Sequence, residues 1–315
     1  MVNSANQIPV RMLAVIVLYK MKPSESVTLN TLQKAISRLE HGQLAIKIFL
    51  FDNTPGGQDI GALPAYMQYK ADVKNGGVAN AYNCALEIAR EEGFDWLITL
   101  DQDTSLPDDF LCKLYHAVAI VGLLNTVAAI VPWVSDDGYV ISPFTIMKYW
   151  IRTKPFPSSF IGIPLKKVYA LNSASTVRVS ALTAIGGYDL DYYLDYSDIE
   201  MYHRLQDNNF SVFIAGNIHV NHESSITDLK NRSNPIRYEG RLRAEEAFYD
   251  EYLGRIERIV LLVKMFYRPV YRIWRMGGDL PFFRISLLCL CRRLFSSRKH
   301  RMETRKLSAK RRLAV

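Results

Sequence analysis

Two carboxylates one residue apart, in Asp101-Gln102-Asp103, directly follow the apolar run Trp96–Leu100. Carboxylates at positions i and i+2 of a turn can both face one hard cation, which prefers oxygen ligands. A Mg²⁺ or Mn²⁺ ion held there can bridge diphosphate oxygens and neutralise a departing diphosphate. By itself the tripeptide is more simply a solvated turn in which Asp103 caps a helix near Pro107. Its place at the end of an apolar strand favours the metal site.

Three acids lie within six residues further along the chain: Asp195, Asp198 and Glu200. A carboxylate here can act as the base that takes a proton from an acceptor hydroxyl, and Asp198 is our candidate. The alternative is that one of the acids caps a helix that begins near Asp198. Both interpretations can hold for different members of the cluster.

His219 and His222 lie three residues apart in a late strand-like segment. An isolated histidine in a strand is usually structural, but the pair strengthens the case for one metal ligand.

Two further polar clusters are candidates for nucleotide binding. Asp52-Asn53 can accept hydrogen bonds from ribose hydroxyls or a base N–H, or can form an Asx turn into the following Pro-Gly-Gly. Asn75-Gly76-Gly77 permits close backbone approach ahead of a helix whose N-terminus attracts phosphate. A plain helix start is the alternative. Neither a Walker loop nor a dinucleotide fingerprint is present.

These clusters require a scaffold of buried strands and helices. Unbroken apolar runs predict strands buried on both faces, and helical spacing predicts helices between them. The strands are expected at 12–19, 45–51 and 96–100, and the helices at 26–39 and 77–90. Such alternation indicates a doubly wound α/β sheet that binds ligands at the carboxyl ends of its strands. The polar clusters should therefore converge on one crevice.

The second half of the predicted catalytic domain is less regular. We expect strands at 128–133, 169–177 and 211–215, and helices at 180–185 and 198–208. The segment 135–164, rich in Pro, Ser and aromatic residues, is expected to be a long active-site loop. The catalytic domain is predicted to span 1–228, with a nucleotide-sugar half up to about 105 and an acceptor half over 106–228.

The C-terminal region 229–315 differs in charge from the rest. The 315-residue chain has a net charge of +8, yet residues 251–315 contain 17 Lys or Arg and only 4 acids. Residues 1–250 contain 22 basic and 27 acidic residues. This asymmetry indicates separate tasks for the two parts.

Residues 255–297 mix apolar and cationic side chains in the pattern of basic amphipathic helices, which bind anionic membrane surfaces. The alternative is packing of these helices on the catalytic domain or on a second subunit of a homo-oligomer. The last 15 or so residues are expected to be disordered. No nucleic-acid-binding signature accompanies the basic end.

Neither a signal peptide nor an apolar stretch of spanning length is evident, so we expect a cytoplasmic protein, peripheral at the inner face of the cell membrane. The four cysteines lack the paired spacing of a zinc site.

Taken together, these motifs resemble the inverting GT-A-fold (Rossmann-like) glycosyltransferases of the large family that includes bacterial rhamnosyltransferases. The resemblance covers roughly residues 10–225. Its pieces occur in the family's order: the strand ending Leu18-Tyr19-Lys20, Asp52-Asn53, Asn75 to Asn83, Asp101-Gln102-Asp103, Gly186 to Asp189, Asp195 to Glu200, and His222-Glu223.

The resemblance implies a role for each position. The donor nucleotide sugar would be bound by Tyr19, Asp52, Asn53, Asn75, Gly76, Asp101 and Gln102. Asp103, Asp101 and His222 would bind the metal, Asp198 would be the base, and Asn172, Asp195 and Glu200 would position the acceptor. Two departures from the family's pattern are Lys20, where Asn or Arg is common, and Ala174, where many relatives have Gly.

The implied reaction is a single displacement by an acceptor hydroxyl. The resemblance favours dTDP-L-rhamnose as the donor and L-rhamnose as the sugar that is transferred. The acceptor would be a lipid-linked saccharide in surface polysaccharide (O-antigen or capsule) assembly. Alternatives are a UDP-Gal or UDP-Glc type donor, a nucleotidyltransferase, or a non-catalytic scaffold protein.

Overall fold

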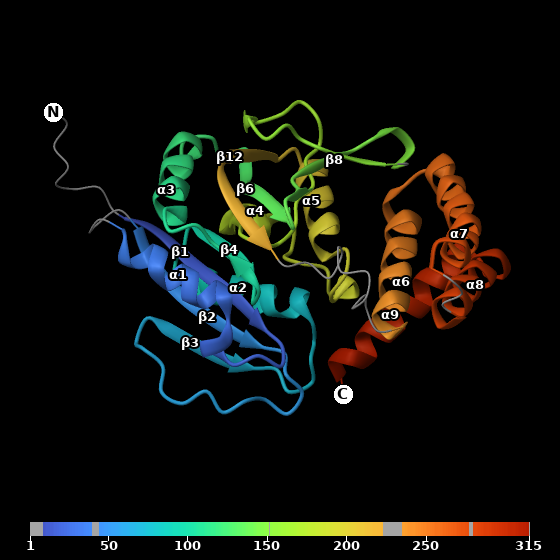
Figure 1. Cartoon of the computed structure of the whole chain (residues 1–315), viewed down its shortest axis with the longest axis horizontal. Helices are drawn as coiled ribbons and strands as arrows, with labels where there is room; N and C mark the ends of the chain where they lie inside the picture. The colour runs from blue at the N-terminus through green and yellow to red at the C-terminus, as the bar shows by residue number, and fades with distance from the viewer. Residues whose placement is uncertain (1–8, 40–43, 151, 223–234, 277–279, 315) are drawn as a thin grey trace.

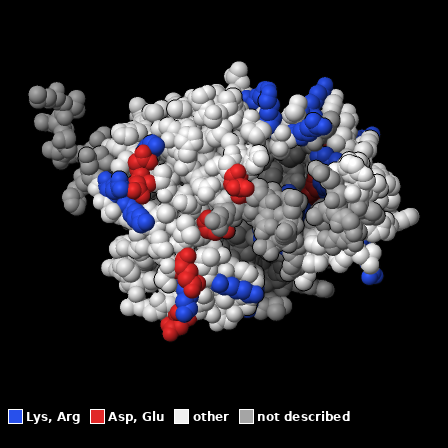
Figure 2. Space-filling view, viewed as in Figure 1, with Lys and Arg blue, Asp and Glu red and all other residues white. Residues whose placement is uncertain are grey.

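The computed structural model describes residues 9–39, 44–150, 152–222, 235–276 and 280–314. An α/β part built around one large sheet lies beside a part made of helices (Figure 1). On the face shown in Figure 2 the surface is hollowed between the two parts, and both acidic and basic atoms are visible inside the hollow.

The doubly wound α/β sheet that the sequence predicts is present and is mixed, and its main strands run in the order β10-β12-β6-β11-β4-β1-β2-β3. β1, β2, β3 and β4 are parallel to one another, whereas β11 runs antiparallel between β4 and β6. Its strands are β1 (Val10–Leu18), β2 (Leu44–Asp52), β3 (Met67–Ala71), β4 (Trp96–Asp101), β5 (Thr104–Ser105), β6 (Val127–Asp136), β7 (Tyr139–Ser142), β10 (Ile161–Gly162), β11 (Ser175–Arg178) and β12 (Ser211–His222).

Helices cover both faces of the sheet because its strands present apolar side chains alternately to each side. On β1, Met12, Ala14 and Ile16 face one core, and Leu13 and Val15 face the other. The first core contains α1 (Val27–Ser37) and α3 (Phe110–Val121); the second contains α2 (Val78–Glu91), α4 (Val179–Ala184) and α5 (Ser197–Asp207). Short 3₁₀ turns occupy Pro23–Glu25, Lys148–Trp150 and Leu190–Tyr192.

Several expectations for the middle of the chain are wrong in detail. The segment 135–164 is not one long loop: it contains β7, β10 and the hairpin of β8 (Phe144–Ile146) and β9 (Thr153–Pro155). Only the end of the expected strand 169–177 is a strand, β11. The turn Asp101-Gln102-Asp103, which is expected to bind a metal, is called the metal turn below. The helix after it has Asp109, not Asp103, at its N-cap position.

Four helices follow the sheet: α6 (Pro235–Tyr252), α7 (Arg255–Met276), α8 (Leu280–Phe295) and α9 (Arg298–Ala314). They share a small core that includes Phe248, Tyr249 and Leu261. Tyr192 of the α/β part belongs to the same core, so the helices pack on the α/β part. No described helix has the length and apolar character needed to cross a membrane.

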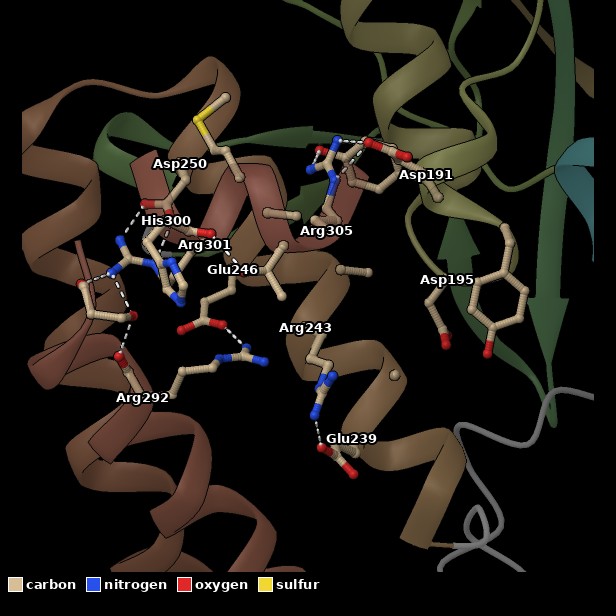
Figure 3. Close-up of a pocket in the computed structure, with 18 of the residues that line it drawn as sticks. Asp191, Asp195, Glu239, Arg243, Glu246, Asp250, Arg292, His300, Arg301 and Arg305 are labelled. Atoms are coloured by element: carbon tan, nitrogen blue, oxygen red, sulfur yellow. Dashed lines mark hydrogen bonds and ion pairs between the residues drawn. The ribbon is translucent and has the colours of Figure 1, made fainter. Parts of the chain in front are cut away.

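The last residues are helical, which corrects the expectation of disorder. Ion pairs hold α9 in place: Arg301 donates to Asp250 at 2.8 Å, and Arg305 donates to Asp191 at 2.9 Å and to Glu251 at 2.7 Å (Figure 3). Acidic partners on α6 and on the α/β part thus neutralise cations that would otherwise repel one another.

Candidate active site

A cavity of about 540 Å³ lies between the carboxyl ends of the central strands and the first helices of the C-terminal part. It brings together Asp101, Asn172, Asp195, Asp198 and His222, which are separated by up to 121 positions in sequence. Five of the predicted site residues therefore converge, as expected for strand ends that meet at one edge of a sheet.

The two carboxylates after β4 have different surroundings. Asp101 Oδ2 accepts a hydrogen bond of 2.6 Å from the Ser173 hydroxyl, which turns this carboxylate toward the β11 side of the cavity. Asp103 Oδ1 lies 3.4 Å from Nδ1 of His222. The short antiparallel pairing of β5 with β12 aligns His222 with Thr104 and so places the histidine beside the metal turn.

Asp103 and His222 are the pair best placed to hold a metal ion. Within the described part of the chain, no group of three or more His, Cys, Asp or Glu side chains is arranged to hold one. Two protein ligands suit a cation that takes its remaining ligands from water and substrate phosphates, as Mg²⁺ and Mn²⁺ do. Asp101, expected to share the metal, is instead engaged by Ser173.

The two histidines of β12 point to opposite faces of the sheet, as strand geometry requires. Side chains three residues apart on a strand point to opposite faces. His219 is exposed and lies against Trp133, with 6.1 Å between ring centroids, whereas His222 faces the metal turn.

Asp198 lies in the first turn of α5 and lines the cavity. Its Oδ1 accepts a hydrogen bond of 2.7 Å from the backbone N–H of Ile199. Burial, reinforced by the nearby charges of Asp101 and Asp195, raises the pKa of Asp198 to about 7 despite that hydrogen bond. A carboxylate with a pKa near 7 is well suited to accept a proton in neutral solution.

The turn before α5 is strained where it presents this acid. Tyr196, the N-cap residue, has a φ of 67°, a left-handed conformation that is uncommon for a bulky side chain. The tight turn allows Asp195 and Asp198 to line the same cavity from opposite ends of the segment.

Asn172 lines the cavity with its side chain already engaged. Its Oδ1 accepts from the Tyr188 hydroxyl at 3.1 Å, and its Nδ2 donates to Ser197 Oγ at 3.4 Å. The Asn83 side chain forms two hydrogen bonds with the backbone of Tyr188: it donates to the Tyr188 carbonyl and accepts from the Tyr188 N–H, both at 2.8 Å. This chain of contacts ties the acceptor side of the cavity to α2.

The predicted nucleotide-binding residues gather at the ends of β1 and β2. Asp52 is fully buried, and its two oxygens accept from the Thr54 N–H at 2.9 Å and from the Tyr69 hydroxyl at 2.7 Å. Burial and the bond to Asp52 raise the pKa of Tyr69 to about 12. Asn53 is also buried, so this pair resembles an internal Asx turn more than an open base-binding edge.

Gln102 crosslinks the metal turn to the first strand. Its side-chain carbonyl accepts from the backbone N–H of Tyr19 at 2.7 Å, and its backbone carbonyl accepts from the Ser26 hydroxyl at 2.9 Å. Tyr19 is 42% exposed, and the Lys20 ammonium lies over its ring, 5.1 Å from the ring centroid.

Asn75 and Gly76 form a plain helix start. Asp72 organises the turn, accepting from the Gly76 N–H and from the Asn80 amide, both at 2.9 Å. The N–H of Ala79, in the first turn of α2, donates to the Tyr193 carbonyl at 3.3 Å. This end of the helix is therefore occupied by protein rather than open to a phosphate, although Val78 and Tyr82 just beyond it line the cavity.

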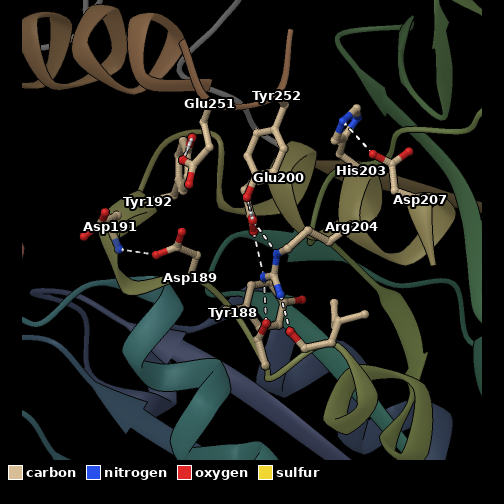
Figure 4. A network of polar contacts seen from close by, with 12 residues as sticks. Tyr188, Asp189, Asp191, Tyr192, Glu200, His203, Arg204, Asp207, Glu251 and Tyr252 are labelled. Carbon is tan, nitrogen blue, oxygen red and sulfur yellow. Dashed lines mark hydrogen bonds and ion pairs between the residues drawn. The ribbon is translucent and has the colours of Figure 1, made fainter. Parts of the chain in front are cut away.

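Glu200 does not line the cavity, so its expected positioning role is replaced by a structural one. The side chain is fully buried and forms an ion pair with Arg204, while the Tyr252 hydroxyl donates to it at 2.6 Å (Figure 4). Arg204 also donates to the carbonyls of Ile185 and Gly187. The pair fastens α5 to the turn after α4 and to α6.

The two departures from the family pattern occupy special backbone positions. Lys20 has a φ of 53° and Ala174 a φ of 63°, where glycine or asparagine is the usual residue.

Sequence reasoning missed Ser173, which orients Asp101, and the arginines that α6 and α7 bring to the cavity: Arg237, Arg241 and Arg268. Arg268 belongs to the strongly basic segment 251–315, whereas Arg237 and Arg241 precede it, and neither composition nor spacing reveals the side on which an arginine lies.

Residues 24–157, less than half of the chain, match the model of the family described as Glycosyl transferase family 2. This segment is therefore similar to glycosyl transferase family 2. The matched segment contains Asp101-Gln102-Asp103, and its sheet continues through β11 and β12, the second of which contains His222.

The fold is similar to that of solved GT-A-like glycosyltransferase structures. The crystal structure of GalNAc-T7 with UDP, GalNAc and Mn²⁺ has a TM-score of 0.56 at 16% identity, over 95% of this chain and 57% of that one. This chain thus spans little more than half of that protein's length. S. aureus TarS has a TM-score of 0.49 at 13% identity, over 85% of this chain and 45% of that one. No curated protein is a significant match.

Proposed function

We propose that this chain transfers a sugar from a nucleotide sugar to an acceptor hydroxyl with inversion at the anomeric carbon. The observation that carries the proposal is the convergence of Asp198, Asp101 and His222 on one cavity at the strand ends, with Asp103 beside His222. A base with a pKa near 7 and a candidate divalent-metal pair are the two elements that a single displacement requires.

Each residue has a defined task in this reaction. Asp198 accepts the proton of the attacking hydroxyl, while Asn172, fixed by Tyr188 and Ser197, borders the acceptor. Asp103 and His222 would hold Mg²⁺ or Mn²⁺, which when bound would neutralise the leaving nucleoside diphosphate. Asp101, oriented by Ser173, lines the same cavity as the base, where it can accept a hydrogen bond from a donor-sugar hydroxyl.

L-Rhamnose from dTDP-L-rhamnose is our preferred donor, by the resemblance of the motifs to bacterial rhamnosyltransferases. UDP sugars are the main alternative, because the GalNAc-T7 structure contains UDP and Mn²⁺. The test is incubation with a panel of dTDP and UDP sugars plus Mn²⁺ or Mg²⁺, measuring nucleoside diphosphate release and donor affinity. A nucleotidyltransferase would release inorganic diphosphate instead, and neither binding nor turnover with any donor would refute the proposal.

We further propose that the C-terminal helices bind an anionic membrane surface that carries the acceptor. One face of α7 exposes Ile259, Val263, Phe266, Val270 and Trp274, whose side chains are 52 to 78% exposed. At 3.6 residues per turn, Arg268 lies on the opposite face, toward the cavity. An apolar stripe on a strongly basic region matches the pattern of helices that lie in a membrane interface.

The test of this surface is co-sedimentation with vesicles of pure phosphatidylcholine or of phosphatidylcholine with 30% phosphatidylglycerol, about the anionic content at which polybasic segments bind. Val263→Asp with Phe266→Asp should abolish binding to the anionic vesicles. Ile120→Asp is the matched control, since Ile120 is 62% exposed on α3 of the α/β part. Equal binding by all variants, or none by the wild type, would refute membrane association.

A further inference from the structure

The wall of the active-site cavity that faces the α/β part is basic. Helix α6 contributes Arg237 and Arg241, and α7 contributes Arg268. The opposite wall carries Asp101, Asp195 and Asp198. The cavity is therefore divided between carboxylates that suit sugar hydroxyls and guanidinium groups that suit an anion.

The three arginines are not equivalent. Arg268 forms a two-point ion pair with Glu245, at 2.5 and 2.7 Å, which satisfies its charge and fixes its position. Arg237 and Arg241 are exposed to the cavity and lie four residues apart, on one face of α6. Neither has an ion-pair partner within 4.0 Å among the described residues.

The charges have an order along the cavity. The guanidinium groups of Arg237 and Arg241 act on Asp195 and oppose the rise that burial causes in its pKa. The neighbouring carboxylates that act on Asp198 are Asp101 and Asp195. Asp195 is therefore the carboxylate on which the arginine wall acts, and Asp198 is the one on which Asp101 acts.

This order assigns the arginine wall to the acceptor side. A donor diphosphate would lie at Asp103 and His222, beyond Asp101. Two neighbouring guanidinium groups of equal charge repel each other unless an anion lies between them, and their planar forks match phosphate oxygens in two-point hydrogen bonds. Asp195 supplies one negative charge near these two cations, and an anionic ligand group would compensate the other, which a neutral saccharide does not do.

We propose that Arg237 and Arg241 bind a phosphate group of the acceptor, so that the acceptor is a phosphate-bearing saccharide rather than a neutral one. The identification of the ligand as the acceptor rests on the proposed glycosyl transfer, whereas the phosphate site itself does not depend on it. A lipid diphosphate and a phosphodiester within a polymer share this chemistry.

The first test measures phosphate binding without turnover. Phenyl phosphate is titrated calorimetrically into the full chain in EDTA, which removes any metal that could hold phosphate at Asp103. Arg237→Ala with Arg241→Ala should weaken binding by about tenfold or more, and 0.5 M salt should weaken wild-type binding strongly. Phenyl glucoside, which carries no charge, should not bind by this route.

Arg243→Ala is the matched control. Arg243 lies on the same helix, two residues beyond Arg241 and therefore on another face, where it forms an ion pair with Glu239 (Figure 3). It should leave phenyl phosphate affinity within about twofold of wild type, because a surface charge off the site adds little. Equal loss in this variant, or no phosphate binding by wild type, would overturn the proposal.

The second test distinguishes acceptor from donor. Affinity for UDP or dTDP with Mn²⁺ should change less than about threefold in the Arg237/Arg241 double variant. A loss as large as that for phenyl phosphate would assign the arginines to the donor diphosphate and overturn the acceptor assignment. If no sugar nucleotide is turned over by wild type, the proposed function fails, whereas the phosphate-binding result stands or falls independently.

The third test uses matched acceptors once a donor is known. A short-chain lipid diphosphate saccharide and the same saccharide as its octyl glycoside are compared at fixed donor. The double variant should raise KM for the phosphate-bearing acceptor by about tenfold and leave the octyl glycoside unchanged. An equal effect on both acceptors would contradict phosphate recognition.

Discussion

Replacing Asp198 with Asn tests the base and its electrostatics in one variant. The pKa of Asp198 rises from 3.8 to about 7 in the folded chain. Each unit is worth 1.36 kcal/mol, so ionising this carboxyl opposes folding by at most about 4 kcal/mol above pH 7. Because the side chain borders an open cavity, water screens part of this energy, and we expect about half.

The sign follows from the raised pKa. Below pH 3.8 the carboxyl is protonated in both folded and unfolded chains, so Asp198→Asn should have little effect on stability there. Between pH 4 and 7 the Asp198 carboxyl ionises in the unfolded chain but stays protonated in the folded chain, so the free energy of unfolding of the wild type falls as the pH rises. The variant has no carboxyl at this position and keeps that stability. The variant's advantage in free energy of unfolding should therefore grow to about 2 kcal/mol and level off above pH 7.

The assays are urea unfolding at pH 4, 6 and 8 together with initial rates of nucleoside diphosphate release. Loss of a general base typically lowers a rate 10²- to 10⁴-fold, and donor affinity should survive. In the wild type, kcat/KM should rise with pH up to about 7 as Asp198 ionises. A stability difference independent of pH, or transfer retained near the wild-type rate, would refute this account of Asp198.

Three further substitutions test the rest of the site. His222→Ala should weaken Mn²⁺-dependent UDP binding, measured by calorimetry, by about tenfold or more. His219→Ala should leave this binding unchanged, because of the two histidines only His222 faces the metal turn. Equal effects of the two substitutions would exclude His222 as a metal ligand. Glu200→Ala should lower the free energy of unfolding by about 3 kcal/mol in urea, since it leaves a buried guanidinium unpaired; a loss confined to activity would restore its expected role at the acceptor. Gly77→Ala should destabilise the chain by about 3 kcal/mol or more, because φ is +88° and the new Cβ would lie 2.2 Å from a backbone carbonyl. Gly56→Ala, with a φ of +85° and nothing within 4 Å, should cost only about 1 kcal/mol, and similar losses at both glycines would exclude the steric explanation.

Local patterns were sufficient to predict the strands and helices around the donor half. The apolar runs that became β1, β2 and β4 are continuous because these strands are buried on both faces, and β2 and β4 end at Asp52 and Asp101, the acids that the sequence marked. The short strands between β6 and β11 could not be predicted in this way, because each has at most four residues and depends on pairing with distant segments.

Residue types alone did not distinguish the roles of Asp198 and Glu200. Asp198 and Glu200 lie two residues apart on one helix, yet one lines the cavity and the other is buried against Arg204 and Tyr252. Their different roles follow from side-chain direction on α5 and from the position of α6, which no local pattern encodes.

The sequence by itself determined that carboxylates, amides and a histidine would meet at the edge of an α/β sheet, because buried strands must end in polar turns and parallel strands end together. Only the tertiary structure decided which of them share a cavity. Ser173 donates a hydrogen bond to Asp101, the pairing of β5 with β12 brings His222 to Asp103, and α6 places two arginines in the cavity that Asp195 also lines. Such contacts join residues far apart in the chain, and their geometry is fixed by packing of whole elements rather than by the pattern within any one of them.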